Sequence, residues 1–212
     1  GYPAVLFFDE ADALFKRRPS GSRDSSFTLV PALLAEMDGM EESGAFLMLA
    51  TNRPDALDPA ITRPGRIDRR IRITRPDQVA SAAIFRIHLD GVYLAEGLTP
   101  YELGQSAAAD LFRDEHVLYE LDLEDETGSG TASFRLRDLA SGALIQNIVD
   151  RATANKMEHC IENGVRAGLT PEDMREAILE VFGEQQETRH PEELEDFVEV
   201  TGRRVAAVRK IV

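Results

Sequence analysis

The amino-acid sequence predicts an α/β fold in two parts: a partial parallel sheet in the first third, then a mostly helical region with a β-hairpin-like insertion. Two short apolar runs, 4–8 and 45–50, have the composition of strands buried on both faces of a parallel sheet, and polar residues follow each run. After Pro76 the apolar residues recur at helical spacing. This change sets the expected boundary between parts 1–76 and 77–212.

The first apolar run leads directly into Asp9 and Glu10. Carboxylates at the carboxyl end of a parallel strand lie where open α/β sheets bind ligands, and two neighbouring acids there suit magnesium–nucleotide chemistry. Asp and Glu also favour the first turn of a helix. This stretch taken alone therefore leaves both interpretations open.

The rest of the first part is read from local patterns. Between the two predicted strands we expect a short helix over 12–18, a polar surface loop and a helix over 27–37. The second strand ends at Thr51 and Asn52. The remaining expected elements are a turn or short helix over 55–61, a tight turn at 63–66 and a third strand over 70–73, nearer the sheet edge.

The second part is predicted to be mostly helical. Apolar spacing predicts helices over 79–87 and 141–160, and Thr170 followed by Pro171 has the residue types of a helix start. Residues 97–137 form the least regular region, in which alternation over 116–136 predicts a hairpin. The remaining expectations are a helix ending at Gly183, an acidic loop over 184–196, and extended or helical pieces at 197–200 and 205–212.

Composition and charge exclude several classes of function. The formal net charge of −14 at pH 7 argues against nucleic acid or an anionic membrane as the main partner. The sequence has no apolar run of about eighteen residues that would predict a membrane span, and it shows no secretory leader. The single cysteine, Cys160, fits a reducing, cytoplasmic setting. Because the chain does not begin with methionine, we expect it to be a fragment of something longer.

Three groups of residues, in order along the chain, resemble the AAA family of ATPases within the AAA+ group. Residues 6–10 (LFFDE) resemble the family's Walker B strand. Residues 50–55 (ATNRPD), with 57–60 (LDPA) and 63–69 (RPGRIDR), resemble its second region of homology. An ordered set of this length is highly specific. The resemblance implies an AAA+ nucleotide-binding subdomain followed by a helical lid subdomain, with ATP and Mg²⁺ as cofactors.

The resemblance also implies a role for each matching residue. Asp9 would hold Mg²⁺, usually through water, since this hard cation prefers oxygen ligands. Glu10 would orient and activate the attacking water, and Asn52, at the sensor-1 position, would hold that water or the γ-phosphate. Arg66 and Arg69 match the arginine fingers, which act on the nucleotide of the neighbouring subunit and stabilise transition-state charge by roughly 10³–10⁵ in rate. A surface salt bridge or a nucleic-acid patch is the alternative for these arginines, and the net charge disfavours the patch.

The helical part contains the residues that the resemblance assigns to adenine. His88 falls where many family members place an adenine-contacting histidine, and Gly142 with Ala143 resembles the small-residue turn that packs on the base. The family often has an acidic residue next, where this chain has Leu144. An ordinary helix-face residue and a helix-entry turn are the alternatives for His88 and Gly142.

The sequence contains no Gly-x-x-x-x-Gly-Lys-Ser/Thr phosphate loop. In the family this loop lies upstream of Walker B. We therefore expect the isolated fragment to bind nucleotide poorly and to be inactive in hydrolysis.

The insertion at about 97–137 is similar to the lid of bacterial proteasome-associated ATPases of the ARC/Mpa type. This similarity implies a cytoplasmic homohexameric unfoldase that threads Pup-tagged proteins into a 20S proteasome. The chain ends at 210–212 (KIV), so the proteasome-docking tail of that family is expected to be absent or truncated. Two alternatives stay open: a AAA remodelling ATPase acting on membranes or filaments, and a non-catalytic ring-assembly module. The intact motif residues weigh against the second.

Overall fold

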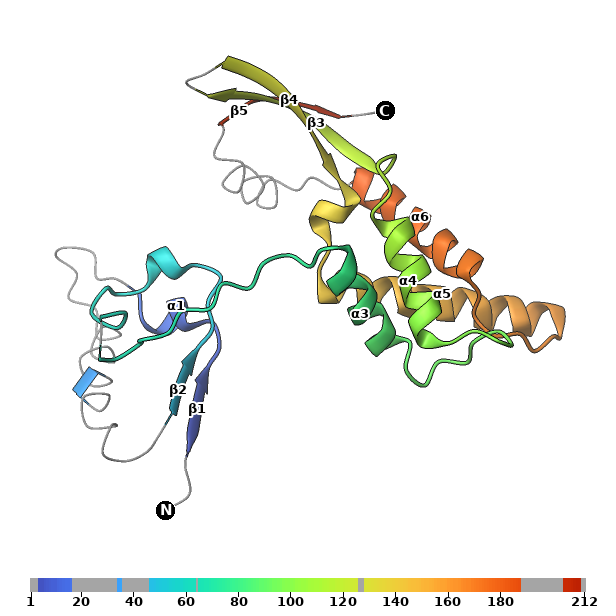
Figure 1. Ribbon diagram of the computed structural model, residues 1–212, viewed down its shortest axis with the longest axis horizontal. Coiled ribbons are helices and arrows are strands. Elements are labelled where there is room, and N and C mark those ends of the chain that lie inside the picture. Colours follow the sequence, from blue (N-terminus) through green and yellow to red (C-terminus); the bar gives the residue numbers. More distant parts are fainter. Residues whose placement is uncertain are drawn as a thin grey trace. The chain divides into compact units, whose positions relative to one another are not determined.

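The computed structural model describes residues 4–16, 34–35, 46–63, 65–125, 128–187 and 204–210. The chain divides into two compact units, Gly1–Ile73 and Thr74–Val212, each of which is described by itself (Figure 1). Helices, a parallel sheet and an antiparallel sheet are all present, so the predicted α/β fold class is confirmed. Within the described part of the chain, no helix combines the length and apolar character needed to cross a membrane.

The first unit contains a two-stranded parallel sheet, as the two apolar runs predict. Strand β1 (Val5–Phe8) pairs with β2 (Phe46–Leu49) in a register that places Phe8 opposite Leu49. The short helix α1 (Ala11–Leu14) follows β1, and the 3₁₀ turn η2 (Pro54–Ala56) follows β2.

A small apolar core joins the segments that follow the two strands. The ring of Phe8, at the end of β1, meets the buried ring of Phe15 edge-on, with 5.4 Å between centroids. The Asp58 N–H donates a hydrogen bond to the Phe15 carbonyl oxygen at 2.8 Å. Because α1 and the chain after β2 share this core, the residues at the two strand ends are held in one local structure. The buried members of the core are Ala11, Phe15, Leu57 and Ile61.

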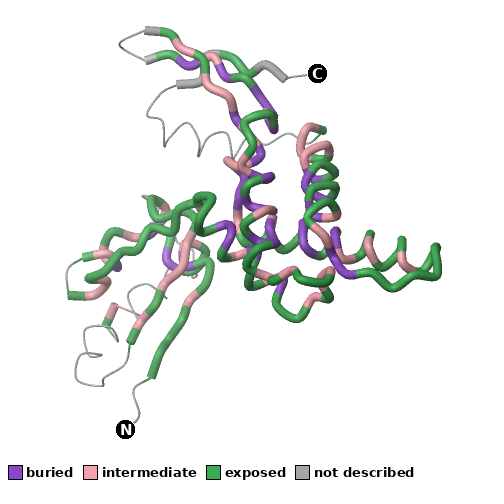
Figure 2. The backbone as a smooth tube through the Cα atoms, turned by 45° about the vertical axis from the view of Figure 1, so that its right-hand side comes forward, coloured by how far each residue is buried: buried purple, intermediate pink, exposed green. Residues whose placement is uncertain are grey.

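Two predictions for this unit are wrong. The strands are not buried on both faces: Val5 and Phe46 are 64% and 61% exposed, because few described residues pack over the sheet (Figure 2). Residues 70–73 are not a strand, since no described strand pairs with them, and alternation without a partner cannot form a ladder. The helix predicted over 27–37 lies outside the described residues, apart from 34–35, which are helical.

The described residues of the second unit include four helices: α3 (Gln78–His88), α4 (Pro100–Leu111), α5 (Gly142–Asn163) and α6 (Pro171–Glu187). Their buried faces share one apolar cluster, drawn as the buried parts of these helices in Figure 2. Capping side chains start two of these helices: the Ser141 Oγ accepts the Leu144 N–H, and the Thr170 Oγ1 accepts the Asp173 N–H, as the sequence predicts for Thr170. The largest side chains in the cluster include Phe85, Leu103, Leu111, Ile145 and Ile148.

Helix α4 occupies part of the region that the sequence pattern indicates as irregular. Its buried face combines Leu103 and Leu111 with the small residues Gly104, Ala107 and Ala108. The available signal is a capping box, in which the Thr99 Oγ1 accepts the Glu102 N–H and the Glu102 carboxylate accepts the Thr99 N–H. Gly104 then allows close packing on α3, because a Cβ at this position would lie 2.9 Å from the Ala82 carbonyl oxygen.

Helix α6 does not stop at Gly183 as predicted but continues to Glu187. The Arg151 guanidinium of α5 donates to both Glu184 carboxylate oxygens, at 2.6 and 2.9 Å, and this bidentate pair ties the additional turn to the neighbouring helix. Residues 184–187 are therefore helical rather than part of the predicted acidic loop, and the rest of that prediction, 188–196, lies outside the described residues.

The predicted hairpin is confirmed. Strand β3 (Val117–Asp125) pairs antiparallel with β4 (Gly128–Arg135), and β5 (Arg204–Lys210) adds to the other edge of β3 (Figure 1). The final piece of the chain is therefore extended rather than helical over these residues. The buried side of the sheet packs against Leu144 and Phe182, so the insertion shares contacts with α5 and α6.

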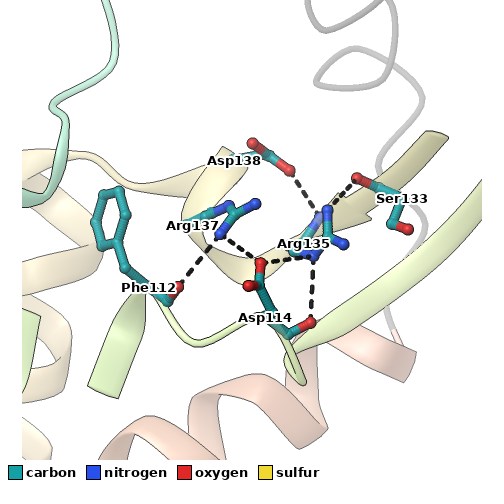
Figure 3. A network of polar contacts seen from close by, with 6 residues as sticks. All are labelled: Phe112, Asp114, Ser133, Arg135, Arg137 and Asp138. Atoms are coloured by element: carbon teal, nitrogen blue, oxygen red, sulfur yellow. Dashed lines mark hydrogen bonds and ion pairs between the residues drawn. The ribbon is translucent and has the colours of Figure 1, made fainter. Parts of the chain in front are cut away.

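A polar network fastens the base of the hairpin to the chain that follows α4 (Figure 3). The Arg137 guanidinium in the 3₁₀ turn η3 (Leu136–Leu139) donates to the Phe112 carbonyl oxygen at 3.3 Å and to Asp114 Oδ1 at 2.9 Å. The Arg135 Nε donates to the Asp114 carbonyl oxygen at 3.2 Å, and its backbone N–H donates to Asp138 Oδ2 at 2.8 Å. Burial raises the pKa of the Asp138 carboxyl, against the effect of that hydrogen bond.

Candidate active site

The chemistry-bearing residues of the first unit lie at the carboxyl ends of β1 and β2. At the end of the sheet, Ala50 bonds to the neighbouring segment twice: the Ala50 N–H donates to the Phe8 carbonyl oxygen at 2.8 Å, and the Ala50 carbonyl oxygen accepts the Ala11 N–H at 2.9 Å. Asp9 and Glu10 lie between these two attachment points. They therefore form a two-residue turn that is clamped at both ends by the neighbouring segment.

Glu10 adopts an unusual backbone conformation in this turn. Its φ of 48° and ψ of 44° place it in the left-handed region, which costs a residue with a side chain about 1–2 kcal/mol. The turn converts β1 into α1, since the Glu10 carbonyl oxygen accepts the Ala13 N–H at 2.8 Å. Asp9 Oδ1 accepts the Glu10 N–H at 2.9 Å, and both acidic residues are exposed to solvent. Such strain persists where the surroundings over-determine the conformation.

Asn52 is also exposed, in the turn that follows β2. The preceding residue fixes that turn: the Thr51 Oγ1 accepts the Arg53 N–H at 3.0 Å and donates to Asp12 Oδ1 at 2.5 Å. This hydrogen bond from Thr51 is the main influence that lowers the pKa of the Asp12 carboxyl, and the charges of Arg53 and Lys16 act in the same direction.

Sequence reasoning did not identify Asp12 or Thr51 as site residues. Both are next to predicted ones, Asp12 two positions after Glu10 and Thr51 immediately before Asn52. Their closeness in sequence to Glu10 and Asn52 could have indicated them. The hydrogen bond between them joins positions 39 residues apart, and no local pattern predicts it.

The predicted arginine fingers lie in the turn at 63–69. Gly65, at φ 86°, makes this turn, and its N–H donates to Asp68 Oδ1 at 2.7 Å. The Arg66 guanidinium is half-buried and donates through Nη1 to the Ala60 carbonyl oxygen at 2.8 Å, whereas Arg69 is exposed. The residues that follow the turn are exposed as far as Ile73.

The residues assigned to adenine lie in the second unit. His88 is half-buried in the last position of α3, and Gly142 and Ala143 are exposed in the first turn of α5. A Cβ built at Gly142 would meet no described atom within 4 Å, so the space next to this helix start is open to a ligand. The structure thus brings Asp9, Glu10 and Asn52 together on one sheet edge and places the adenine candidates in the separately described unit.

Two cavities of about 430 and 510 Å³ also lie in the second unit. The smaller lies next to Arg135 and Arg137, and the larger lies between the Tyr93 loop and the end of α5 near Met157. None of the predicted site residues lines either cavity.

The acidic residues of the site fit a magnesium ion whose other ligands are water and nucleotide phosphate oxygens. The described residues contain no group of three or more His, Cys, Asp or Glu side chains arranged to hold a metal. Mg²⁺ in nucleotide sites keeps several waters and takes one or two protein carboxylates together with phosphate oxygens. Exposed Asp9 at the strand end can supply that single carboxylate.

Comparison with known proteins matches both units. The profile of a family described as "ATPase family associated with various cellular activities (AAA)" matches residues 1–75, and the profile "ARC, AAA+ ATPase lid domain" matches residues 97–212. A Kocuria rhizophila protein described as "AAA ATPase forming ring-shaped complexes" is 39% identical over 96% of this chain and 37% of its own length. A Corynebacterium jeikeium protein of the same description is 37% identical over 88% of this chain and 39% of its own.

A "Proteasome-associated ATPase" of Pseudarthrobacter chlorophenolicus is 34% identical over the whole of this chain and 39% of its own length. The chain therefore spans less than two-fifths of the length of these relatives.

Proposed function

This chain belongs to the AAA family of ATPases, with a lid domain of the ARC type, and from that premise we propose that it forms the Walker B-to-lid portion of a bacterial ATPase that unfolds proteins for a 20S proteasome. The descriptions of the relatives support the proposal, since they include ring-shaped complexes and a proteasome-associated ATPase. Pup-tagged proteins are the proposed substrates, a homohexamer the proposed assembly and the cytoplasm the proposed location.

The observation that carries the catalytic part is the clamped Asp9–Glu10 turn on the same sheet edge as Asn52. Asp9 would hold the Mg²⁺ of bound ATP, whose charge stabilises the transferring phosphoryl group. Glu10 would accept hydrogen bonds from the attacking water and take its proton. Asn52 would hold that water or the γ-phosphate through its side-chain amide.

The two arginines would complete the site of an adjacent subunit. Arg69 is exposed, and the backbone contact of Arg66 fixes the turn from which both side chains extend. A guanidinium keeps its charge at every physiological pH and can bind two phosphate oxygens at once. On this proposal the ring is required for hydrolysis, because each site takes its arginines from a neighbour.

The lid would bind the base. His88 at the end of α3 and the small residues Gly142 and Ala143 at the start of α5 are the proposed adenine contacts, and the open space at Gly142 is consistent with close approach of a planar ring. Because the sequence contains no phosphate-loop motif, we propose that hydrolysis belongs to the full-length protein and that this chain alone is inactive.

Glu10→Gln in the full-length protein tests the central assignment. The amide cannot accept the proton of water, so ATP binding should persist while turnover falls by about 10²–10⁴-fold, the usual contribution of a general base. Nucleotide binding is measured by fluorescence titration and turnover by phosphate release. The matched control is Glu176→Gln, an exposed glutamate on α6, which should leave both unchanged. Wild-type turnover by the Glu10→Gln protein would refute the assignment.

A further inference from the structure

The structure contains a side-chain link between the two turns of the proposed catalytic site. The Thr51 hydroxyl donates to the Asp12 carboxylate at 2.5 Å, and the bond is partly buried. Asp12 lies two residues after Glu10, and Thr51 lies immediately before Asn52. The link therefore joins the backbone segment of the proposed base to that of the proposed water-holding amide.

We propose that Asp12 and Thr51 are positioning residues for ATP hydrolysis, whose hydrogen bond fixes Glu10 and Asn52 relative to each other. This inference rests on the proposed function, because it requires Glu10 and Asn52 to act on the same water.

The second bond of the same hydroxyl makes Thr51 well suited to this role. Its Oγ1 accepts the Arg53 N–H at 3.0 Å, so one hydroxyl spans the backbone on both sides of Asn52. A local bond of this kind tightens a turn in the manner of an Asx or ST motif. Removing the hydroxyl frees the Asn52 turn and breaks the connection to α1 in one step.

The fold of the first unit does not depend on the Thr51–Asp12 hydrogen bond. The backbone bonds of Ala50 and the buried core around Phe15 already hold the two segments together. One hydrogen bond makes only a modest net contribution to stability, so losing it should leave the unit folded. Catalysis is more sensitive, because a misplacement of about 1 Å in a reacting group can cost 10²-fold in rate.

The charge state of Asp12 agrees with its role as acceptor. The Thr51 hydrogen bond, followed by the charges of Arg53 and Lys16, lowers the pKa of the Asp12 carboxyl, so the carboxylate stays ionised at neutral pH. An ionised acceptor makes a shorter and stronger bond than a neutral one.

The test compares Thr51→Val with Thr51→Ser in the full-length protein. Valine keeps the shape and removes the hydroxyl, whereas serine keeps the hydroxyl. We expect Thr51→Val to lower kcat by about 10–100-fold with KM changed by less than about threefold, and Thr51→Ser to restore kcat to within about threefold of wild type. Asp12→Ala should match Thr51→Val, and the double variant should be no slower than either single one.

Two comparisons separate positioning from a general structural effect. In an Asn52→Ala background, Thr51→Val should have no further effect on kcat, since it acts through Asn52. The matched control is Thr153→Val in α5, whose hydroxyl donates to the Val149 carbonyl oxygen at 2.8 Å and whose loss should leave kcat unchanged.

Wild-type kcat in Thr51→Val overturns the proposal, as does a loss confined to KM or an undiminished effect in the Asn52→Ala background. If Thr51→Val fails to assemble, Asp12→Ala decides by the same criteria. Failure of this proposal can be told apart from failure of the proposed function. A Glu10→Gln protein that hydrolyses ATP refutes the proposed function. If Glu10→Gln is inactive but Thr51→Val is fully active, only the positioning role is refuted.

Discussion

Replacing Glu10 by glycine should stabilise the turn after β1 while abolishing activity. Glu10 is the one non-glycine residue in the described part of the chain with a positive φ, at 48°. Glycine adopts this conformation without steric cost but lacks the carboxylate that we assign to water activation. Glu10→Ala is the informative comparison, because it also lacks the carboxylate and retains a Cβ.

The expected difference follows from two opposing terms. A left-handed conformation costs a residue with a Cβ about 1–2 kcal/mol. Glycine loses roughly 0.5–1 kcal/mol more backbone entropy than alanine when it folds. The balance leaves the Glu10→Gly protein roughly 0–1.5 kcal/mol more stable than the Glu10→Ala protein in this turn, with a central value of about 0.75 kcal/mol.

Amide hydrogen exchange in the full-length protein measures this difference locally. The Ala11 and Ala50 N–H groups make the two bonds that clamp the turn, so their free energy of opening reports its stability. Ala13→Gly is the matched control: Ala13 is exposed and helical in α1, and glycine there should cost up to about 1 kcal/mol. Equal or weaker protection in Glu10→Gly than in Glu10→Ala would refute the strain, and both variants should lack ATPase activity.

Two further predictions concern the second unit. Gly104→Ala should destabilise it by about 1–3 kcal/mol in urea unfolding, because the Cβ would meet backbone atoms of α3 at 2.9 and 3.1 Å, whereas Gly183→Ala, with open space around it, should stabilise α6 by about 0.5–1 kcal/mol. Burial lowers the pKa of His116, whose Nδ1 has no hydrogen-bond partner among the described residues. The unfolded state therefore binds the proton more readily, and the free energy of unfolding should be fully retained above about pH 6.5 and fall as the pH drops below it. His116→Phe should remove that fall in urea titrations, and exposed His159→Gln should not.

Local periodicity predicts the elements that carry long side chains. The apolar runs of β1 and β2, the alternation of the hairpin and the strong stripe of α5 each determine an element without reference to the rest of the chain. Helix α4 was not predicted, although Leu103, Ala107 and Leu111 recur on one buried face, with Gly104 at the closest approach to α3. Its capping box was present in the sequence and is the signal that could have located it.

Burial depends on partners that a local pattern does not specify. Residues 70–73 alternate as a strand does, yet Ile71 and Ile73 are 73% and 87% exposed. Helix α6 continues through Gly183, and in its last turn Glu184 pairs with Arg151 on another helix. In each case the outcome was decided by a tertiary contact, or by its absence among the described residues.

In the candidate site, too, local sequence identifies some features, whereas others depend on contacts between distant segments. Asp9, Glu10 and Asn52 could be named from residue type and order, because both apolar strands end in polar groups at one edge of a parallel sheet. The left-handed conformation of Glu10 and the bond from Thr51 to Asp12 could not be named, because each depends on how two distant segments meet.

The left-handed conformation of Glu10 and the bonds around it explain how the proposed base is held in place. A strained residue keeps its conformation only when its neighbours restrain it on both sides, and here Ala50 binds the backbone before and after the Asp9–Glu10 turn. These restraints come from the first unit alone, whereas the proposed adenine contacts belong to the second. The geometry of the proposed base would thus be set before nucleotide binds. The strain at Glu10 would then be offset by the free energy of folding and would not reduce the affinity for ATP.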